Sequence, residues 1–178
     1  MRYVALLRGV NVGGNGKVDM RELASVFEAA GLSRVKTYIN SGNVLFDFDG
    51  ADRDALTHDL EAAIEGRFGA AIRVLVKSQP EVASIVAALP DDWTNDDAMK
   101  CDVFFLWPSV DSPGIVDELP YDPAIDDVRY TPGAVLRSVA RENAAKSKLT
   151  RISGTPLYQA MTIRNCNTAR RLLALMAE

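Results

Sequence analysis

Residues 3–48 read YVALLRGVNVGGNGKVDMRELASVFEAAGLSRVKTYINSGNVLFDF, and this stretch decides the fold. The apolar run from Tyr3 to Leu7 predicts a central strand that is buried on both faces. Asp19 stands three residues before Glu22, which is the spacing of a capping box, so a helix is predicted to begin at the next residue, Met20. A glycine at position 31 is predicted to end that helix, because glycine adopts the left-handed conformation of a helix C-terminus.

The same stretch continues into two strands. Alternating apolar residues predict strands over 35–39 and 44–48, and residues 40–43 form the turn between them. A second helix over 52–65 and a strand over 72–76 follow. The order strand, helix, strand, strand, helix, strand is that of a ferredoxin-like unit, an antiparallel sheet with both helices on one face.

The rest of the chain repeats this order without visible sequence identity. The predicted elements are strand 102–107, helix 110–119, strands 125–130 and 134–139, helix 144–152, strand 158–164 and a terminal helix capped by Asn167 or Thr168. The fold class is therefore α+β, with two tandem ferredoxin-like (βαββαβ) halves, antiparallel sheets, a connecting helix and a C-terminal helix. We expect the first half at 1–78, the connecting helix and acidic linker at 79–100, and the second half with its C-terminal helix at 101–178.

Composition excludes several function classes. Two cysteines, Cys101 and Cys166, are too few for a disulfide framework or a four-ligand zinc site, and His58 is the only histidine. On the predicted helix His58 points away from the core side, so neither zinc hydrolysis nor a Ser-His-Asp triad is expected. We expect no metal and no cofactor. No apolar run approaches the roughly 18 residues of a membrane helix, and no signal peptide is visible, so we expect a cytoplasmic protein with no membrane partner.

Cationic residues concentrate toward the end of the chain. From Arg129 onward nine Lys or Arg residues face two Glu, whereas the preceding part carries 11 cationic and 22 acidic side chains. This basic quarter is either a surface for an anionic ligand or a region that pairs with the acidic remainder. The net charge of −4 favours pairing, because an acidic protein steers long polyanions poorly.

A ferredoxin-like order is shared with RNA-recognition modules, which stack bases on aromatic side chains of the sheet. Here Asn43 and Leu45 hold the positions that should present such rings, and Phe46 and Phe48 alternate toward the core. Tyr3 alone is expected on the open face. RNA binding through this face is therefore a minority interpretation, and nucleic acid is not an expected partner.

Polar residues at the ends of predicted strands are the candidate ligand-binding residues. The glycine-rich loop after the first strand could cradle an anion with backbone amides, although it matches neither the P-loop nor the dinucleotide-binding pattern, and Gly13 and Gly14 could equally serve only the turn. The segment from residue 146 to 172 places further donors beside a helix N-terminus. The candidate set is Arg8, Asn11, Lys17, Ser41 and Asn43 in the first half, and Arg164, Asn165 and Asn167 in the second.

Three motifs give the chain a resemblance to a known family. LLRGVNVGG (residues 6–14), TYINSGNVLF (37–46) and TIRNCNTARRL (162–172) are similar to LLRGINVGG, YIQSGNVVF and TARNWNTVxKL of the domain-of-unknown-function family numbered 1697. The chain departs from this pattern at Cys166, where the family usually shows Trp. The resemblance covers essentially the whole chain and implies a duplicated ferredoxin-like fold, with no assigned activity.

Three hypotheses for the function remain open. The first is a protein that binds a small anionic metabolite or nucleotide in a cleft between the halves, with Arg8 and Arg164 lining that cleft and the terminal helix directed into it. The alternative for Arg8 and Arg164 is a structural one, in which each arginine holds together its own half. The second hypothesis is an enzyme of unidentified reaction type, which a carboxylate with a raised pKa in such a cleft would favour. The third is an interaction or nucleic-acid-binding module that uses the basic quarter.

Overall fold

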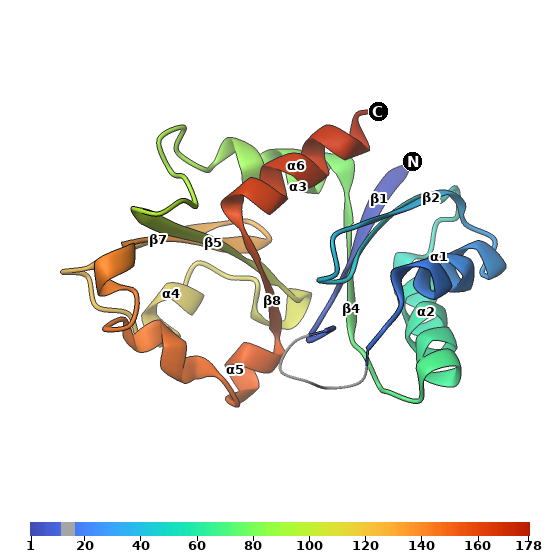
Figure 1. Ribbon diagram of the computed structural model, residues 1–178, viewed down its shortest axis with the longest axis horizontal. Coiled ribbons are helices and arrows are strands. Elements are labelled where there is room, and N and C mark those ends of the chain that lie inside the picture. The colour runs from blue at the N-terminus through green and yellow to red at the C-terminus, as the bar shows by residue number, and fades with distance from the viewer. Residues whose placement is uncertain (12–16) are drawn as a thin grey trace. The chain divides into compact units, whose positions relative to one another are not determined.

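The computed structural model describes residues 1–11 and 17–178, apart from the Thr150 side chain. The chain divides into two units, Met1–Pro80 with Ala174–Glu178, and Glu81–Leu173. Each unit contains a four-stranded antiparallel sheet (Figure 1). The predicted α+β fold with two ferredoxin-like halves is thereby confirmed.

The first sheet has β1 (Arg2–Leu7) at its centre. The strand order is β2 (Ser33–Tyr38), β3 (Asn43–Asp47), β1 and β4 (Val74–Ser78), which is the ferredoxin-like order. From Val4 to Leu7 every residue of β1 is buried, as the apolar run predicted. β1 is hydrogen bonded to a neighbouring strand on each side, so the residues at its two ends lie in the middle of the sheet.

Two helices cover one face of this sheet, α1 (Met20–Ala29) and α2 (Arg53–Phe68). The start of α1 is as predicted: the Asp19 carboxylate accepts hydrogen bonds from the backbone N–H groups of Arg21 at 2.8 Å and Glu22 at 3.1 Å. These bonds lower the pKa of Asp19, because they stabilise its charged form. The Glu22 side chain, for its part, forms an ion pair with Arg67 of α2 at 3.0 Å.

The core of the first unit lies between the helices and the sheet. It contains Leu23 and Phe27 of α1, Leu60 and Ile64 of α2, and Phe46 of β3. Tyr3 belongs to this core, because its ring stacks on Phe46 with the centroids 5.9 Å apart. The expectation that Tyr3 lies on the open face is therefore wrong; Tyr3 is directly opposite Phe46 in the β1–β3 register, and opposite residues share a face.

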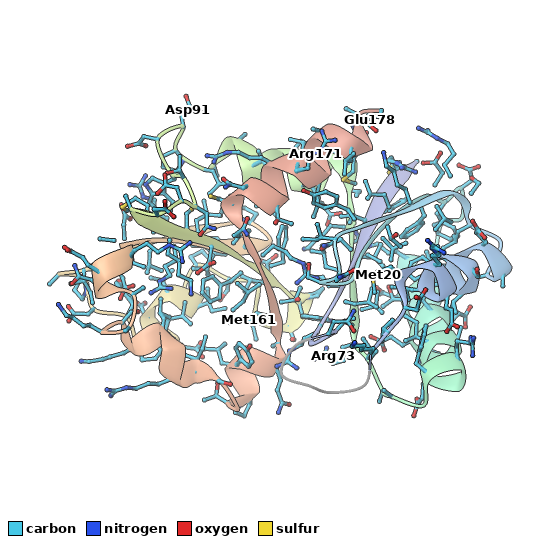
Figure 2. All side chains as sticks on the ribbon, in the orientation of Figure 1. Met20, Arg73, Asp91, Met161, Arg171 and Glu178 are labelled. Carbon is cyan, nitrogen blue, oxygen red and sulfur yellow. The ribbon has the colours of Figure 1, made fainter. Side chains whose placement is uncertain are left out.

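The second sheet has the same topology. The strand order is β6 (Asp126–Thr131), β7 (Ala134–Ala140), β5 (Met99–Leu106) and β8 (Met161–Asn165), and all neighbours are antiparallel. Before β5 come α3 (Gln79–Ala87) and an acidic connector, from which Asp91 projects (Figure 2). The connector is anchored to the second unit, because Trp93 is buried and stacks against the guanidinium of Arg129 at 4.8 Å.

The crossovers of the second unit are shorter helical pieces than predicted. Between β5 and β6 lie η1 (Pro108–Val110) and α4 (Ile115–Glu118), because Pro113 disfavours a continuous helix through the residue before it. The predicted helix 144–152 is wrong, since residues 144–147 separate η2 (Arg141–Asn143) from η3 (Lys148–Ile152). The Ser147 hydroxyl accepts from the N–H of Leu149, and this local bond competes with a continuing helix.

Two helices flank β8. A single turn, α5 (Pro156–Gln159), precedes it with Thr155 as N-cap, and α6 (Cys166–Met176) follows it directly. The cap of α6 differs from the prediction, because the N–H of Thr168 donates to the side-chain oxygen of Asn165 at 2.8 Å. The strand therefore passes into the helix without a connecting loop.

We predict that Gly42, in the turn before β3, tolerates no side chain. It has φ +72°, and a Cβ there would lie 2.8 Å from Leu7 Cβ, whereas Gly31 has φ +82° and open space around it. Gly31→Ala should cost about 1–2 kcal/mol for the left-handed backbone alone. Gly42→Ala should cost roughly 1–3 kcal/mol more, because the turn must move away from β1. Urea unfolding of both variants measures the difference, and equal losses would contradict the close packing.

Candidate functional site

In the first half, Asn11 holds the ends of the glycine-rich loop. Its side-chain oxygen accepts from the N–H of Val18 at 2.9 Å, and its amide nitrogen donates to the carbonyls of Val18 at 3.1 Å and Asn40 at 2.9 Å. The residue has φ +56°, a conformation that asparagine tolerates better than most residues. Asn11 therefore connects the loop to the β2–β3 turn. Gly13 and Gly14 lie outside the described residues.

Ser41 and Asn43 hold the β2–β3 turn itself. Asn43 is fully buried, and its amide nitrogen donates to the Tyr38 carbonyl and to the Ser41 hydroxyl, both at 3.0 Å. Gly42 between them accepts a hydrogen bond from the N–H of Leu7 at 2.8 Å. These contacts give the Ser-Gly-Asn motif a structural role at the end of β1.

Lys17 is exposed and lines a surface depression of about 650 Å³ with Asn11, Asp19, Arg21 and Asn40. Arg8, at the end of β1, is half-buried and donates its backbone N–H to the Arg73 carbonyl at 2.9 Å. The amides at the start of α1 already face the Asp19 carboxylate. An anion in this depression would therefore rely on the side chains of Lys17 and Arg21.

In the second half, the three predicted residues around the start of α6 also have structural partners. Arg164 is buried, and its Nη1 donates to the Thr162 hydroxyl at 3.0 Å and to the Ile163 carbonyl at 2.8 Å. Burial lowers the pKa of Arg164 to about 10. Asn165 caps α6, and the exposed Asn167 donates to the Asn95 carbonyl at 2.9 Å. The predicted meeting of Arg8 and Arg164 joins residues of different units, and it stays a prediction.

A cavity that the sequence did not predict lies within the second half. Its volume is about 300 Å³, and its lining comes from β5, β7, β8, η3 and α5 together with Ser153, which follows η3. The apolar lining residues Leu149 and Ile152 belong to the helix-side core of this unit. The lining residues are Lys100, Asp102, Phe104, Arg137, Leu149, Ile152, Ser153, Tyr158 and Ile163.

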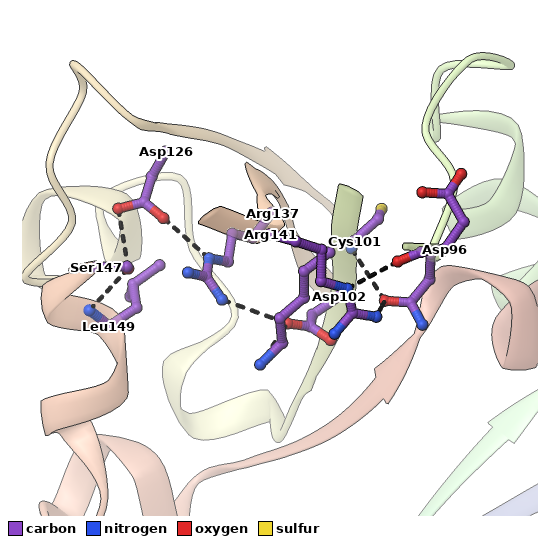
Figure 3. A network of polar contacts seen from close by, with 10 residues as sticks. Asp96, Cys101, Asp102, Asp126, Arg137, Arg141, Ser147 and Leu149 are labelled. Atoms are coloured by element: carbon purple, nitrogen blue, oxygen red, sulfur yellow. Dashed lines mark hydrogen bonds and ion pairs between the residues drawn. The ribbon is translucent and has the colours of Figure 1, made fainter. Parts of the chain in front are cut away.

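Arg137 is the central polar residue of this cavity. It is 3% exposed, its Nε donates to Asp126 at 3.0 Å, and its Nη1 donates to Asp102 at 3.4 Å (Figure 3). Asp102 is directly opposite Arg137 in the β5–β7 register, so both side chains lie on the same face of the sheet. Asp126 also accepts from the Ser147 hydroxyl at 2.9 Å, and Ser147 in turn binds the N–H of Leu149. The network thereby fixes the start of η3 over the sheet.

One nitrogen of Arg137 is left without a hydrogen bond. Among the residues that the structure describes, none accepts from Nη2, although this atom is buried. Figure 3 shows Nη2 on the side of the guanidinium toward Leu149, which lines the cavity. A buried donor of this kind is unusual, because buried polar groups in folded proteins nearly always have a partner.

Asp102 has an altered acidity. Burial raises its pKa above the usual value, and the nearby charges of Lys100 and Arg137 only partly oppose this effect. The Lys100 ammonium lies 3.8 Å from the Asp102 carboxylate and is partly exposed. The site therefore combines a buried guanidinium, a carboxylate that protonates more readily than usual, and an ammonium group near solvent.

The sequence itself indicates this site, although neither the composition nor the polar residues at the ends of strands point to it. Arg137 interrupts the apolar strand from Ala134 to Val139, and Asp102 stands within the apolar strand that ends at Leu106. Charged residues are almost never buried without a partner, so a charge inside a buried strand predicts a pairing or a site. Which carboxylate pairs with which cation still depends on the strand register.

Residues 1–136 match the family described as Protein of unknown function (DUF1697), and the chain belongs to this family, as its motifs indicated. A solved structure, that of the conserved bacterial protein SP0830 from Streptococcus pneumoniae, is similar over 98% of each chain, with 27% identity and a TM-score of 0.79. Comparison with the curated proteins finds no match. In residues 1–11 and 17–178, none of the helices has the length and apolarity that a membrane crossing requires.

We predict that Asp102 makes the protein less stable as the pH rises. Its folded-state pKa is raised, so the folded protein binds more protons than the unfolded chain between the unfolded and the folded pKa, and stability falls as the pH increases through that range. Asp102→Asn removes this contribution. Urea unfolding across the acidic range should show that the variant gains stability relative to the wild type as the pH rises. A constant difference between the two proteins would contradict the raised pKa.

Proposed function

We propose that the protein binds a small molecule with a carboxylate or phosphate group, and that the second-half cavity holds this group. The observation that carries the proposal is Nη2 of Arg137, a buried donor with no acceptor among the described residues. Leaving such a donor unsatisfied costs about 1–3 kcal/mol. A ligand oxygen that reaches Nη2, an atom that neighbouring side chains cover in this structure, would recover this free energy through a charge-assisted hydrogen bond.

The other lining residues indicate what the rest of the ligand looks like. Phe104, Leu149, Ile152 and Ile163 supply apolar walls, and Lys100 supplies a second cation at a partly exposed position. Small-molecule sites typically combine mostly apolar walls with a few polar groups that fix orientation. The lining therefore favours an anionic group attached to a small apolar body, and benzoate is the simplest probe of this kind.

Asp102 allows the cavity to adjust its charge to an anion. A negative ligand beside Asp102 would raise its pKa further, because like charges disfavour the ionised form. Lys100, Arg137 and Arg141 are the cations that oppose this effect. Binding of an anion would then be accompanied by proton uptake, and its affinity would increase as the pH falls.

The same carboxylate supports a second candidate function. A buried acid with a raised pKa in a cavity is a typical general acid or base, so an enzyme with Asp102 in that role is the alternative. The two functions differ in what Asp102→Asn does. In a binding protein the variant would keep the ligand, whereas in an enzyme it would keep the ligand and lose turnover.

The predicted set Arg8, Asn11, Lys17, Ser41 and Asn43, with Arg164, Asn165 and Asn167, remains the competing location for the anion. Most of these side chains are engaged in turns and caps, as described above. Lys17 is exposed and lines the first-half depression. Lys17 in the first half and Lys100 in the second can therefore be compared directly, because each is a lysine with exposed surface at one of the two candidate locations.

We predict that benzoate binds to the second-half cavity, as measured by isothermal titration calorimetry with the full chain. Lys100→Gln should weaken binding by about tenfold or more, because a hydrogen bond to a charged group is worth about 1.5–3 kcal/mol. Ser153→Trp, at an exposed lining position, should block the cavity. Affinity for benzoate should increase from mildly alkaline to mildly acidic buffer, and Asp102→Asn should lose that dependence.

Lys17→Gln is the control and should leave benzoate affinity unchanged. If Lys17→Gln weakens binding and Lys100→Gln does not, the anion lies in the first half and the second-half site is wrong. If neither benzoate nor inorganic phosphate binds at all, the proposal of an anion-binding protein is wrong.

Several cations of the basic quarter are engaged within the second half. Arg129 pairs with Asp127 at 2.7 Å, Arg141 donates to the Asp96 carbonyl at 2.8 Å, and Arg170 donates to the Trp93 carbonyl at 2.7 Å. Such contacts leave fewer cations for phosphate. They support the expectation that the basic quarter does not serve as a nucleic-acid surface.

We predict that the protein has negligible affinity for RNA and DNA. An open cationic surface would bind more weakly as salt increases, because bound counterions are released on binding. Fluorescence anisotropy with short single- and double-stranded probes, at low and at near-physiological salt, measures this. Micromolar binding that weakens with added salt would restore the nucleic-acid hypothesis.

A further inference from the structure

The two cysteines of the chain adjoin the same strand pair in the second half. The β5–β8 register ends with Asp102 paired to Asn165; Cys101 precedes Asp102 in β5, and Cys166 follows Asn165 as the first residue of α6. Both are buried free thiols. They are also the only cysteines in the sequence, which makes their chemistry easy to follow.

Their arrangement is suited to a covalent link. Paired residues of antiparallel strands have Cα atoms about 4.5 or 5.5 Å apart, so the residues that adjoin the Asp102–Asn165 pair start from a separation close to the roughly 4.4–6.8 Å that disulfides span. Each thiol also shifts the pKa of the other, which requires the two sulfur atoms to be close together. A link therefore requires little movement of the backbone.

The two thiols differ in acidity. The hydrogen bond from Cys101 lowers the pKa of Cys166 to about 7, and the Arg170 charge and the Asn167 N–H act in the same direction. The same hydrogen bond, together with burial, raises the pKa of Cys101. The pair therefore releases one proton more easily than the other, and the first proton comes from Cys166.

We propose that Cys101 and Cys166 are a redox-active pair that peroxide converts to a reversible intramolecular disulfide. The Cys166 thiolate attacks one oxygen of hydrogen peroxide, the O–O bond breaks, and hydroxide leaves and takes up a proton to form water. The Cys101 sulfur then attacks the resulting sulfenic acid, the S–O bond breaks, and the Cys101 proton leaves with the departing hydroxide as a second water. Two thiols lose two electrons, and peroxide gains them.

A thin and mostly exposed cover separates Cys166 from solvent. The Cys166 thiol lies 3.6 Å from the Trp93 carbonyl in the connector before β5, and most connector residues from 91 to 98 are exposed. The cover is held by bonds from Arg170 to the carbonyls of Pro90 and Trp93 and from Asn167 to that of Asn95. Local opening of an exposed segment is the ordinary route by which a small reagent reaches a buried group.

The link would join a strand to a helix. Cys101 belongs to β5 and Cys166 is the first residue of α6. Figure 3 shows Cys101 beside Asp102 in β5, and successive residues of a strand point to opposite faces. Oxidation on one face of β5 would therefore stiffen the strand that carries Asp102 on the other face.

The test is treatment of the reduced, folded full-length protein with hydrogen peroxide, followed by intact mass spectrometry and thiol counting in denaturant. The expected product is a monomer that has lost two hydrogen atoms and both free thiols, that contains a Cys101–Cys166 crosslinked peptide, and that dithiothreitol restores. Oxidation should also raise the midpoint of urea unfolding, because the crosslink restricts the unfolded chain.

Single variants test the order of the two steps. In Cys101→Ala, Cys166 should stop at a sulfenic acid that dimedone traps. In Cys166→Ala, Cys101 should react at least about tenfold more slowly, since the thiolate is the reactive form. Retention of two thiols in the wild type, a disulfide between two chains, or further oxidation of Cys166 without a crosslink would each overturn the proposal, and the wild-type result does not depend on the folding of either variant.

Discussion

The pairing of the Arg137 guanidinium with two buried carboxylates is the interaction on which the second half depends. Arg137 lies in the interior of the sheet, where an uncompensated charge costs several kcal/mol. Asp126 and Asp102 neutralise it from opposite sides, and Asp126 also holds Ser147, which starts η3. The wall of the cavity is thus fixed by charge neutralisation, and Asp102 is kept in a place where burial raises its pKa. The same buried charges therefore hold the wall of the cavity in place and surround the carboxylate whose pKa is raised.

The polar residues of the shared motifs serve mainly the backbone. Asn11, Asn43 and Asn165 each bond backbone groups at the end of a strand, where N–H and C=O groups would otherwise lack partners. Asparagine suits this role because its amide is both a donor and an acceptor. The groups of the proposed cavity and of the cysteine pair lie within β5 and β7 and at the start of α6. Apart from Cys166, which stands in the third shared motif, they lie outside these motifs, and β5 carries both Asp102 and Cys101.

The sequence by itself determined the order of the elements and much of their ends. The buried run of β1, the Asp19 cap of α1 and the repeated βαββαβ order all follow from local patterns, because helix caps and strand alternation involve residues close in the chain. Local reasoning failed where distant partners intervene. The helix expected over 144–152 is broken because Ser147 bonds Asp126, which is 21 residues away, and Tyr3 is in the core because Phe46 lies opposite it.

Only the tertiary structure decided which polar residues are reactive. Arg137 meets Asp102 across 35 residues, and Cys101 and Cys166 both adjoin the Asp102–Asn165 pair of β5 and β8, so both pairs depend on how distant strands align. A shift of one residue in either register would turn these side chains to opposite faces of the sheet. The pKa values also depend on the fold. Burial raises the pKa of Asp102 and neighbouring groups lower that of Cys166, and both conditions exist only once the strands have paired.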